Sequence, residues 1–287
     1  MTTTTTVSNN TWGFDMETLL LTYNTVIKPS FSYIVPIWGP NIKPSNVAKL
    51  QSCQNRGLRL VTGCHQATSV SHLHNETGVL PIQTRIDMLC SQFLASAMRT
   101  DHPSHETVLR HPGPRVNAKT GRPLKETLAS KYMSVVEPFL SDGVIKEIVY
   151  KKTLDKIHSD SVKLAKSQND FNEVLQGPPP KVSSSECLLS HHHRVILRQL
   201  RGKQCSLLRD YLLKIKAVND DLSPLCSSAS QNVCHLFSCP AYPTSLSPLS
   251  LWTEPVKTMR FLVSLPTFRS LPPVVLPPAR PPPEPDP

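Results

Sequence analysis

The sequence predicts a mainly α-helical protein. Apolar residues recur at helical spacing in several segments, and capping residues, glycines and prolines mark where these segments begin and end. Stretches rich in proline, glycine and basic residues separate the predicted helices. Of the 287 residues, 39% are apolar, so the chain is long enough for one or two domains with a core, although not for a core throughout.

The clearest helix is predicted over residues 45–63. Ser45 can cap its start, and Gly63 can take the left-handed conformation that ends a helix. Its apolar face consists of Val47, Leu50, Leu58 and Val61. Its opposite face is basic and carries Lys49, Arg56 and Arg59. Two residues do not follow from this pattern, because Gln54 lies within the apolar face and Gly57 weakens the helix interior. Both therefore have a specific role.

The residues before this helix are predicted to be a disordered end followed by a short helical region. Residues 1–13 are rich in threonine and lack the pattern of a transit peptide, so they form the disordered leader. A helix begins at Asp15, and Pro29 is expected to end it. The apolar run over residues 31–38 is interpreted as buried and helical, with a strand as the alternative.

Further helices are predicted after residue 63. Residues 84–99 carry a continuous apolar stripe that is expected to pack against the apolar face of residues 45–63. Residues 102–122 are predicted to be an exposed basic loop, followed by helices over residues 124–139 and 144–157. The lysines of the last helix fit a solvated face at least as well as a track for phosphates.

A break and a second helical region complete the predicted organisation. Residues 159–182 lose helical periodicity and end in a glycine and three prolines, which predicts a linker. Residues 183–252 form a C-terminal helical region, and residues 253–287 are expected to be a proline-rich, disordered tail. Near the end of the first helix of this region stand four basic residues, Arg194, Arg198, Arg201 and Lys203.

The charge of the chain favours an anionic partner. The formal net charge is +10 and the isoelectric point is about 9.3, and nucleic acid is the commonest partner of such proteins. The eight cysteines are scattered and no secretory signal is visible, which favours a reducing compartment in the nucleus or cytoplasm. The longest apolar run near the start is too short to span a membrane.

Several segments together resemble a known family. The stretch KLQSCQNRGLRLVTG, preceded by VIKPSFSYIVPIWGP, is similar to the region downstream of the palm in reverse transcriptases of jockey-like non-long-terminal-repeat retrotransposons. The matching positions are Lys49, Leu50, Gln51, Gln54, Asn55, Leu58, Arg59, Thr62 and Gly63. The similarity continues in HLHNETGVLPIQTRI, in VILRQLRGKQCSLLRDYLLKI and in CHLFSCPAYPT.

The resemblance implies a fold and a partner. Residues 14–101 would form a small helical bundle like the polymerase thumb, and residues 102–158 a basic loop with a helical extension. RNA or DNA would be the partner as template or primer, contacted by Lys49, Arg56, Arg59, Arg194, Arg198, Arg201 and Lys203. The catalytic aspartates of the family have no counterpart here, so no catalytic magnesium is expected in this chain.

A cluster of cysteine and histidine near the C-terminus suggests a metal site. In the family, a C-x-x-C pair, a histidine and a final cysteine would bind zinc. Cys226, His235 and Cys239 match three of these positions, whereas Ser223 stands where the first cysteine belongs. Cys234 is an imperfect substitute, because adjacent side chains diverge. We therefore expect a weakened or lost zinc knuckle, with a complete site that includes Cys234 as the alternative.

Three functions remain open from the sequence. The chain can be a fragment of a retrotransposon reverse transcriptase that binds template and primer without a catalytic palm. It can be a freestanding nucleic-acid-binding protein, or a degenerate, partly folded reading frame without specific activity. An independent polymerase is disfavoured, because the only adjacent aspartates, Asp220 and Asp221, lie in a polar turn rather than beside buried strands.

Overall fold

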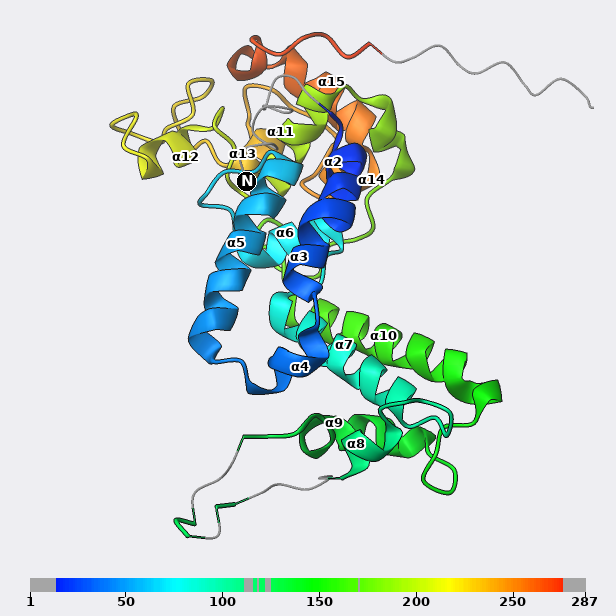
Figure 1. The fold of residues 1–287 in the computed structure, drawn as a ribbon. Coiled ribbons are helices and arrows are strands. Elements are labelled where there is room, and N and C mark those ends of the chain that lie inside the picture. The colour runs from blue at the N-terminus through cyan, green and yellow to red at the C-terminus, as the bar shows by residue number, and fades with distance from the viewer. Residues whose placement is uncertain (1–13, 111–115, 118, 122–124, 170, 276–287) are drawn as a thin grey trace, which may run out of the picture. The chain divides into compact units, whose positions relative to one another are not determined.

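The computed structural model describes residues 14–110, 116–117, 119–121, 125–169 and 171–275. Within these residues the protein is helical, with isolated β-bridges in place of strands, which confirms the mainly α prediction (Figure 1). The expected leader, residues 1–13, and the last part of the expected tail, residues 276–287, lie outside the described residues.

The helices fall into two compact units, each built from separate stretches of chain. Unit 1 contains residues 1–19, 58–76 and 170–287, and unit 2 contains residues 20–57 and 77–169. Helix α5 (Pro44–Thr62) belongs to both, because the division falls between Gly57 and Leu58. A single helix therefore contributes residues to both units.

The region before α5 is helical but interrupted. Helix α2 (Met16–Thr22) continues through a π-helical turn (Tyr23–Ile27) into α3 (Lys28–Ser32), and α4 (Val35–Trp38) leads into a 3₁₀ turn (Gly39–Asn41). Pro29 does not end the first helix as expected, because it lies in the first turn of α3. A proline there costs little, since the N–H that it lacks has no partner within the helix.

Unit 2 is organised around α7 (Ile82–Ala97). This helix packs against α9 (Leu128–Val136), which continues into a 3₁₀ turn (Glu137–Phe139), and against α10 (Glu147–Asn169), while α8 (His105–Leu109) lies between α7 and α9 in the sequence. The core includes Ile86, Cys90, Leu94, Tyr132, Val136 and Ile157. Val47 and Leu50 of α5 are partly buried against this core, as the sequence predicted.

The predicted packing of α5 differs in its second half. Leu58 and Val61 are buried, but they belong to unit 1 rather than to the core around α7. Gly57 has a steric role in unit 2, because a β-carbon at this position would lie 3.2 Å from the ring of Tyr23. The apolar stripe is continuous along the helix, yet its two halves belong to different units.

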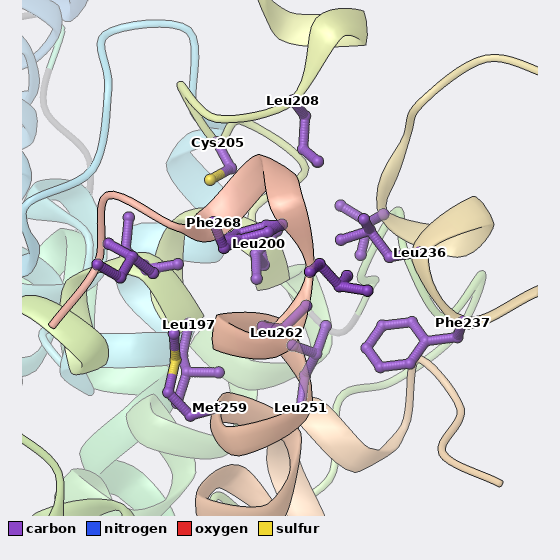
Figure 2. Packing of buried hydrophobic residues seen from close by; sticks show 14 of the residues in the cluster. Leu197, Leu200, Cys205, Leu208, Leu236, Phe237, Leu251, Met259, Leu262 and Phe268 are labelled. Carbon is purple, nitrogen blue, oxygen red and sulfur yellow. The ribbon is translucent and has the colours of Figure 1, made fainter. Parts of the chain in front are cut away.

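Unit 1 is centred on α11 (His191–Arg201). Around it lie α14 (Ser250–Thr253) and α15 (Pro255–Ser264), with α13 (Val233–Ser238) and 3₁₀ turns at Ser184–Leu188 and Pro266–Phe268. Figure 2 shows Leu197 and Leu200 of α11 packed with Met259, Leu262 and Phe268. Helices α6 (Val70–Thr77) and α12 (Arg209–Lys214) complete the described helices of this unit.

Two predicted boundaries shift because apolar residues at those positions join a core. Helix α10 continues to Asn169, so residues 159–169 are helical rather than a linker, with Ala165 buried. Residues 255–264 form α15 rather than a tail, and Leu262, Leu265, Phe268 and Leu271 are buried in unit 1. Among the described residues, we find no helix with the length and hydropathy needed to cross a membrane.

The buried position of Leu58 makes a testable prediction. Its side chain is fully buried, so the substitution Leu58→Ala should lower the free energy of unfolding by about 2 to 5 kcal/mol. Leu21→Ala is the matched control, because Leu21 is 63% exposed and its removal should change stability by less than about 0.5 kcal/mol. Urea titration measures both values, and equal small losses would place Leu58 at the surface.

Candidate metal centre and buried arginines

The candidate metal centre of unit 1 is built from a turn and a short helix. Leu222 and Ser230 pair as an isolated antiparallel bridge, which closes the turn that carries Cys226. Within it, the N–H of Ser227 donates to the carbonyl of Ser223 at 2.8 Å. Ser227 adopts a φ of +53°, a left-handed conformation that lets the chain reverse direction just after Cys226.

The other two ligands come from α13 and its end. Asn232 caps this helix, and its side chain accepts a hydrogen bond from the N–H of His235 at 2.9 Å. The cap fixes the first turn of α13, so the His235 ring faces the turn and its Nε2 lies 3.2 Å from Sγ of Cys226. Cys239 follows the last residue of α13 and is buried.

These three residues could hold a metal ion. The sulfur atoms of Cys226 and Cys239 and a ring nitrogen of His235 all lie within 4.8 Å of one another. In a tetrahedral zinc site the metal–ligand distances are about 2.0 to 2.3 Å, which puts neighbouring ligand atoms about 3.3 to 3.8 Å apart. The three atoms thus converge closely enough for one ion, with small side-chain adjustments.

Hydrogen bonds prepare Cys226 for this role. The Ser228 hydroxyl donates to its sulfur at 3.0 Å. Hydrogen bonds from the side chain and backbone of Ser228, followed by those from Ser223 and His235, lower the pKa of the Cys226 thiol to about 6. The thiolate, which is the form that binds metals, is therefore favoured near neutral pH.

Cys234 is not part of this group, so the predicted ligand set is corrected. Its side chain is exposed, and its sulfur lies 3.9 Å from the carbonyl of Val174. The reason is geometric, because consecutive side chains on a helix point about 100° apart and His235 takes the inward direction. Ser223, by contrast, is buried, and its side chain helps to lower the pKa of the Cys226 thiol. The missing fourth ligand thus coincides with a serine that already faces the site.

Three of the arginines predicted to bind nucleic acid lie inside unit 1. Arg194, Arg198 and Arg201 are all buried and share one face of α11. Each pairs with a glutamate: Arg194 with Glu17, and Arg198 with Glu186 at 3.7 Å. Arg201 pairs with both Glu186 and Glu76, the latter at 3.4 Å. Arg198 and Arg201 neutralise buried carboxylates and offer no charge to a phosphate outside the protein, whereas Glu17, the partner of Arg194, is exposed.

Arg201 is the centre of this network. Its Nε donates to the carbonyl of Leu251 at 3.1 Å, and its own carbonyl accepts from the side chain of Asn172 at 3.0 Å. Its guanidinium carbon lies 5.7 Å from the ring centre of Trp252. Burial alone would lower the pKa of Arg201, but Glu76 and Glu186 raise it above its ordinary value. The charge is therefore fully compensated by its neighbours.

The same network governs the titration of the residues around it. Burial would raise the pKa of Glu76, but Arg201, His72 and Arg198 lower it below the usual range, so this carboxylate stays ionised. Burial lowers the pKa of His72, whose Nε2 lies 3.0 Å from the carbonyl of Arg198. His72 is consequently neutral and donates this hydrogen bond, which fits a structural role.

The remaining basic candidates differ in exposure. Lys49 and Arg56 are exposed on the unit 2 part of α5. Arg59 is half-buried in unit 1, where it donates to the carbonyl of Thr68 at 3.1 Å. Lys203 lies 3.9 Å from Glu173 at the surface of unit 1. Lys49 and Arg56 are thus the two predicted residues that present charge to solvent without a partner among the described residues.

The burial of α11 could not be inferred from its own sequence. The apolar residues Val195, Ile196, Leu197 and Leu200 lie away from the face that carries the three arginines, which is the pattern of a helix at a protein surface. The acidic partners could not be found in this way, because Glu76 lies 125 residues before Arg201. No periodicity within α11 reveals that pairing.

The residues that carry the family resemblance also have structural roles. In unit 2, Gln54 donates to the carbonyl of Leu80 at 3.1 Å, and Gln51 accepts from the N–H of Ile82 at 2.9 Å. In unit 1, Gly63 has a φ of +72°, and a β-carbon there would lie 2.8 Å from Val195. Gln54 is therefore buried in an apolar stripe because it ties α5 to the start of α7.

Comparison with known proteins assigns no role to these residues. No protein-family model, curated protein or solved structure matches the chain. The function is therefore inferred from the charges and geometry of the protein itself.

Removing the central arginine should destabilise unit 1. Arg201→Met leaves Glu76 and Glu186 buried without their main partner and should cost about 3 to 5 kcal/mol. Arg209→Met is the matched control, since Arg209 pairs with Asp220 at the surface and should cost less than about 1 kcal/mol. Thermal and urea unfolding report both values. Similar costs for the two variants would refute a central role for Arg201.

Proposed function

We propose that this chain is a nucleic-acid-binding helical protein related to the post-palm region of jockey-like reverse transcriptases, in which unit 2 contacts RNA or DNA. The observation that carries the proposal is the distribution of charge. Unit 2 contains 18 Lys and Arg residues against 9 Asp and Glu, and so carries +9 of the total net charge of +10. Unit 1 contains the other 13 Lys and Arg residues against 12 Asp and Glu, and is nearly neutral.

The position of the charge supports the proposal further. Residues 20–57 contain four basic residues and no acidic residue. Lys49 and Arg56 of this stretch are exposed on α5, and Lys125, Lys146 and Lys166 are exposed elsewhere in the same unit. Such a surface attracts the phosphate backbone and carries no array for reading bases. Binding should therefore be salt-sensitive and tolerant of sequence.

The family resemblance fits this division of roles. Its motif residues Gln51, Gln54 and Gly63 are positions that hold the helices in place, whereas Lys49 projects to solvent. The proposal assigns to this chain the grip on template or primer and no nucleotidyl transfer. The purified chain should accordingly fail to extend an annealed primer in buffers containing magnesium or manganese.

A charge-removal experiment tests the proposal. One variant replaces four exposed basic residues of unit 2 by glutamine: Arg56, Lys125, Lys146 and Lys166. The matched control removes four exposed charges of unit 1: Lys181, Lys214, Arg260 and Arg269. Affinity for labelled duplex and single-stranded oligonucleotides is measured by fluorescence anisotropy at salt concentrations between about 50 and 200 mM. On duplex DNA, each neutralised phosphate contributes about −0.9 to the slope of log affinity against log salt concentration.

The unit 2 variant should lose about tenfold or more in affinity at low salt. Its salt slope should be shallower, because a protein with fewer positive charges neutralises fewer phosphates and releases fewer counterions on binding. The control should lose markedly less. Equal losses in the two variants would mean that net charge alone attracts nucleic acid. Absence of binding by the wild-type chain at low salt would refute the proposal altogether.

For the metal centre we propose zinc, because two thiolates and an imidazole are ligands that this ion prefers. Zinc held by Cys226, His235 and Cys239 would tie the turn after Leu222 to α13 and stabilise unit 1. With three protein ligands, the site should bind more weakly than a closed four-ligand site.

Zinc content after dialysis tests this assignment. Cys239→Ser should abolish retention, and Cys234→Ser should leave it unchanged, because Cys234 points away from the group. Ser223→Cys supplies a third thiolate, and so a fourth ligand, and should raise zinc affinity by at least tenfold. An unchanged affinity in that variant, or a loss in Cys234→Ser, would overturn the ligand set.

A further inference from the structure

Unit 2 has a surface hollow beside the start of α5 that the charge argument above does not use. Its volume is about 810 Å³, within the range of sites for small ligands. The 3₁₀ turn before α5, the first turns of α5 and Trp38 line it. The lining residues are Trp38, Asn41, Ile42, Lys43, Ser45, Asn46, Lys49 and Leu50.

The charge of this hollow has one sign. Lys43 and Lys49 are both exposed, and neither has an ion-pair partner among the described residues. None of the described lining residues is acidic, and residues 20–57 as a whole contain no Asp or Glu. Two unpaired ammonium groups without a carboxylate favour an anionic ligand, and Ser45 and Asn46 add polar side chains that can hydrogen-bond it.

The aromatic ring in the hollow is held in place before any ligand arrives. Trp38 is partly buried against the core of unit 2, and its indole N–H donates to the carbonyl of Tyr33 at 2.7 Å. The hydrogen bond satisfies the one polar group of the ring, and the remaining ring surface lines the hollow. A fixed aromatic surface beside two lysines suits a ligand that combines an aromatic ring with phosphate.

We propose that this hollow binds a nucleotide unit of single-stranded nucleic acid, with a base stacked on Trp38 and the adjoining phosphates neutralised by Lys43 and Lys49. A single strand is required, because the faces of paired bases in a duplex are already covered by their neighbours. The proposal rests on the proposed function and assigns it a location. It also gives Trp38 and Lys43 specific roles in binding, which the charge of unit 2 alone does not assign to them.

A pair of double variants tests the role of the lysines in the full-length chain. Lys43→Gln with Lys49→Gln should weaken binding of a labelled single-stranded 20-mer by about tenfold at low salt. Each phosphate contact to a single strand contributes about 0.7 to the salt slope, so the loss of two contacts should reduce the slope by about 1.4. Lys151→Gln with Lys152→Gln removes the same charge from exposed positions on α10. This control should lose less than about threefold.

A second comparison isolates stacking. Trp38→Leu should weaken binding of a thymidine 20-mer by about tenfold and leave binding of an abasic strand of equal length unchanged within about twofold. Circular dichroism confirms that the variant remains helical. If Trp38→Leu is unfolded, the lysine pair decides the question, because those side chains are exposed and their removal leaves the fold intact.

The outcomes separate this inference from the proposed function. If the wild-type chain binds no nucleic acid, both fail. If it binds but the Lys43 and Lys49 variant behaves like the α10 control, only the hollow is excluded. Equal weakening of the base-bearing and abasic strands by Trp38→Leu excludes stacking, and preferential weakening of duplex binding by the lysine pair excludes a single-strand site.

Discussion

The fold of unit 1 depends on the guanidinium group of Arg201. It is fully buried and contacts Glu76 of α6, Glu186 of the 3₁₀ turn before α11 and the carbonyl of Leu251. A buried charge without partners is far more costly than an apolar side chain, so these elements must all be in place for the arginine to enter the interior. The pairs therefore select one arrangement of α6, α11 and α14 from the many that hydrophobic packing alone would allow.

This use of arginine explains why charge in the sequence and charge at the surface differ. The basic residues at the end of α11 resemble a phosphate-binding cluster until their acidic partners are known. In unit 2, the excess lysine and arginine residues have few acidic residues with which to form ion pairs, and their charge remains at the surface. The protein thus separates a nearly neutral unit with internal ion pairs from a basic unit that can attract nucleic acid.

Local sequence patterns predicted most of the helices but did not predict to which unit their side chains belong. Gly63 and the apolar stripe before it were sufficient to predict α5, and Gln54 was recognised as exceptional. The helix begins at Pro44, so Ser45 lies inside it and does not cap it as predicted. The division of the stripe between two units could not be predicted, because Leu50 and Leu58 have the same character and lie on the same face. Likewise, the family resemblance pointed to Cys226, His235 and Cys239 as candidate ligands, and the structure brings them together, whereas the exclusion of Cys234 required the orientation of α13.

The interleaving of the two units has a consequence for folding during synthesis. All of unit 2 lies between residues 20 and 169, so its core can close as soon as α10 has left the ribosome. Unit 1 can fold only later, because Glu76 and the end of α5 are synthesised early, whereas Arg201 lies 125 residues after Glu76. Until then, Leu58 and Val61 lack most of the unit in which they are buried, and these apolar side chains stay exposed to solvent.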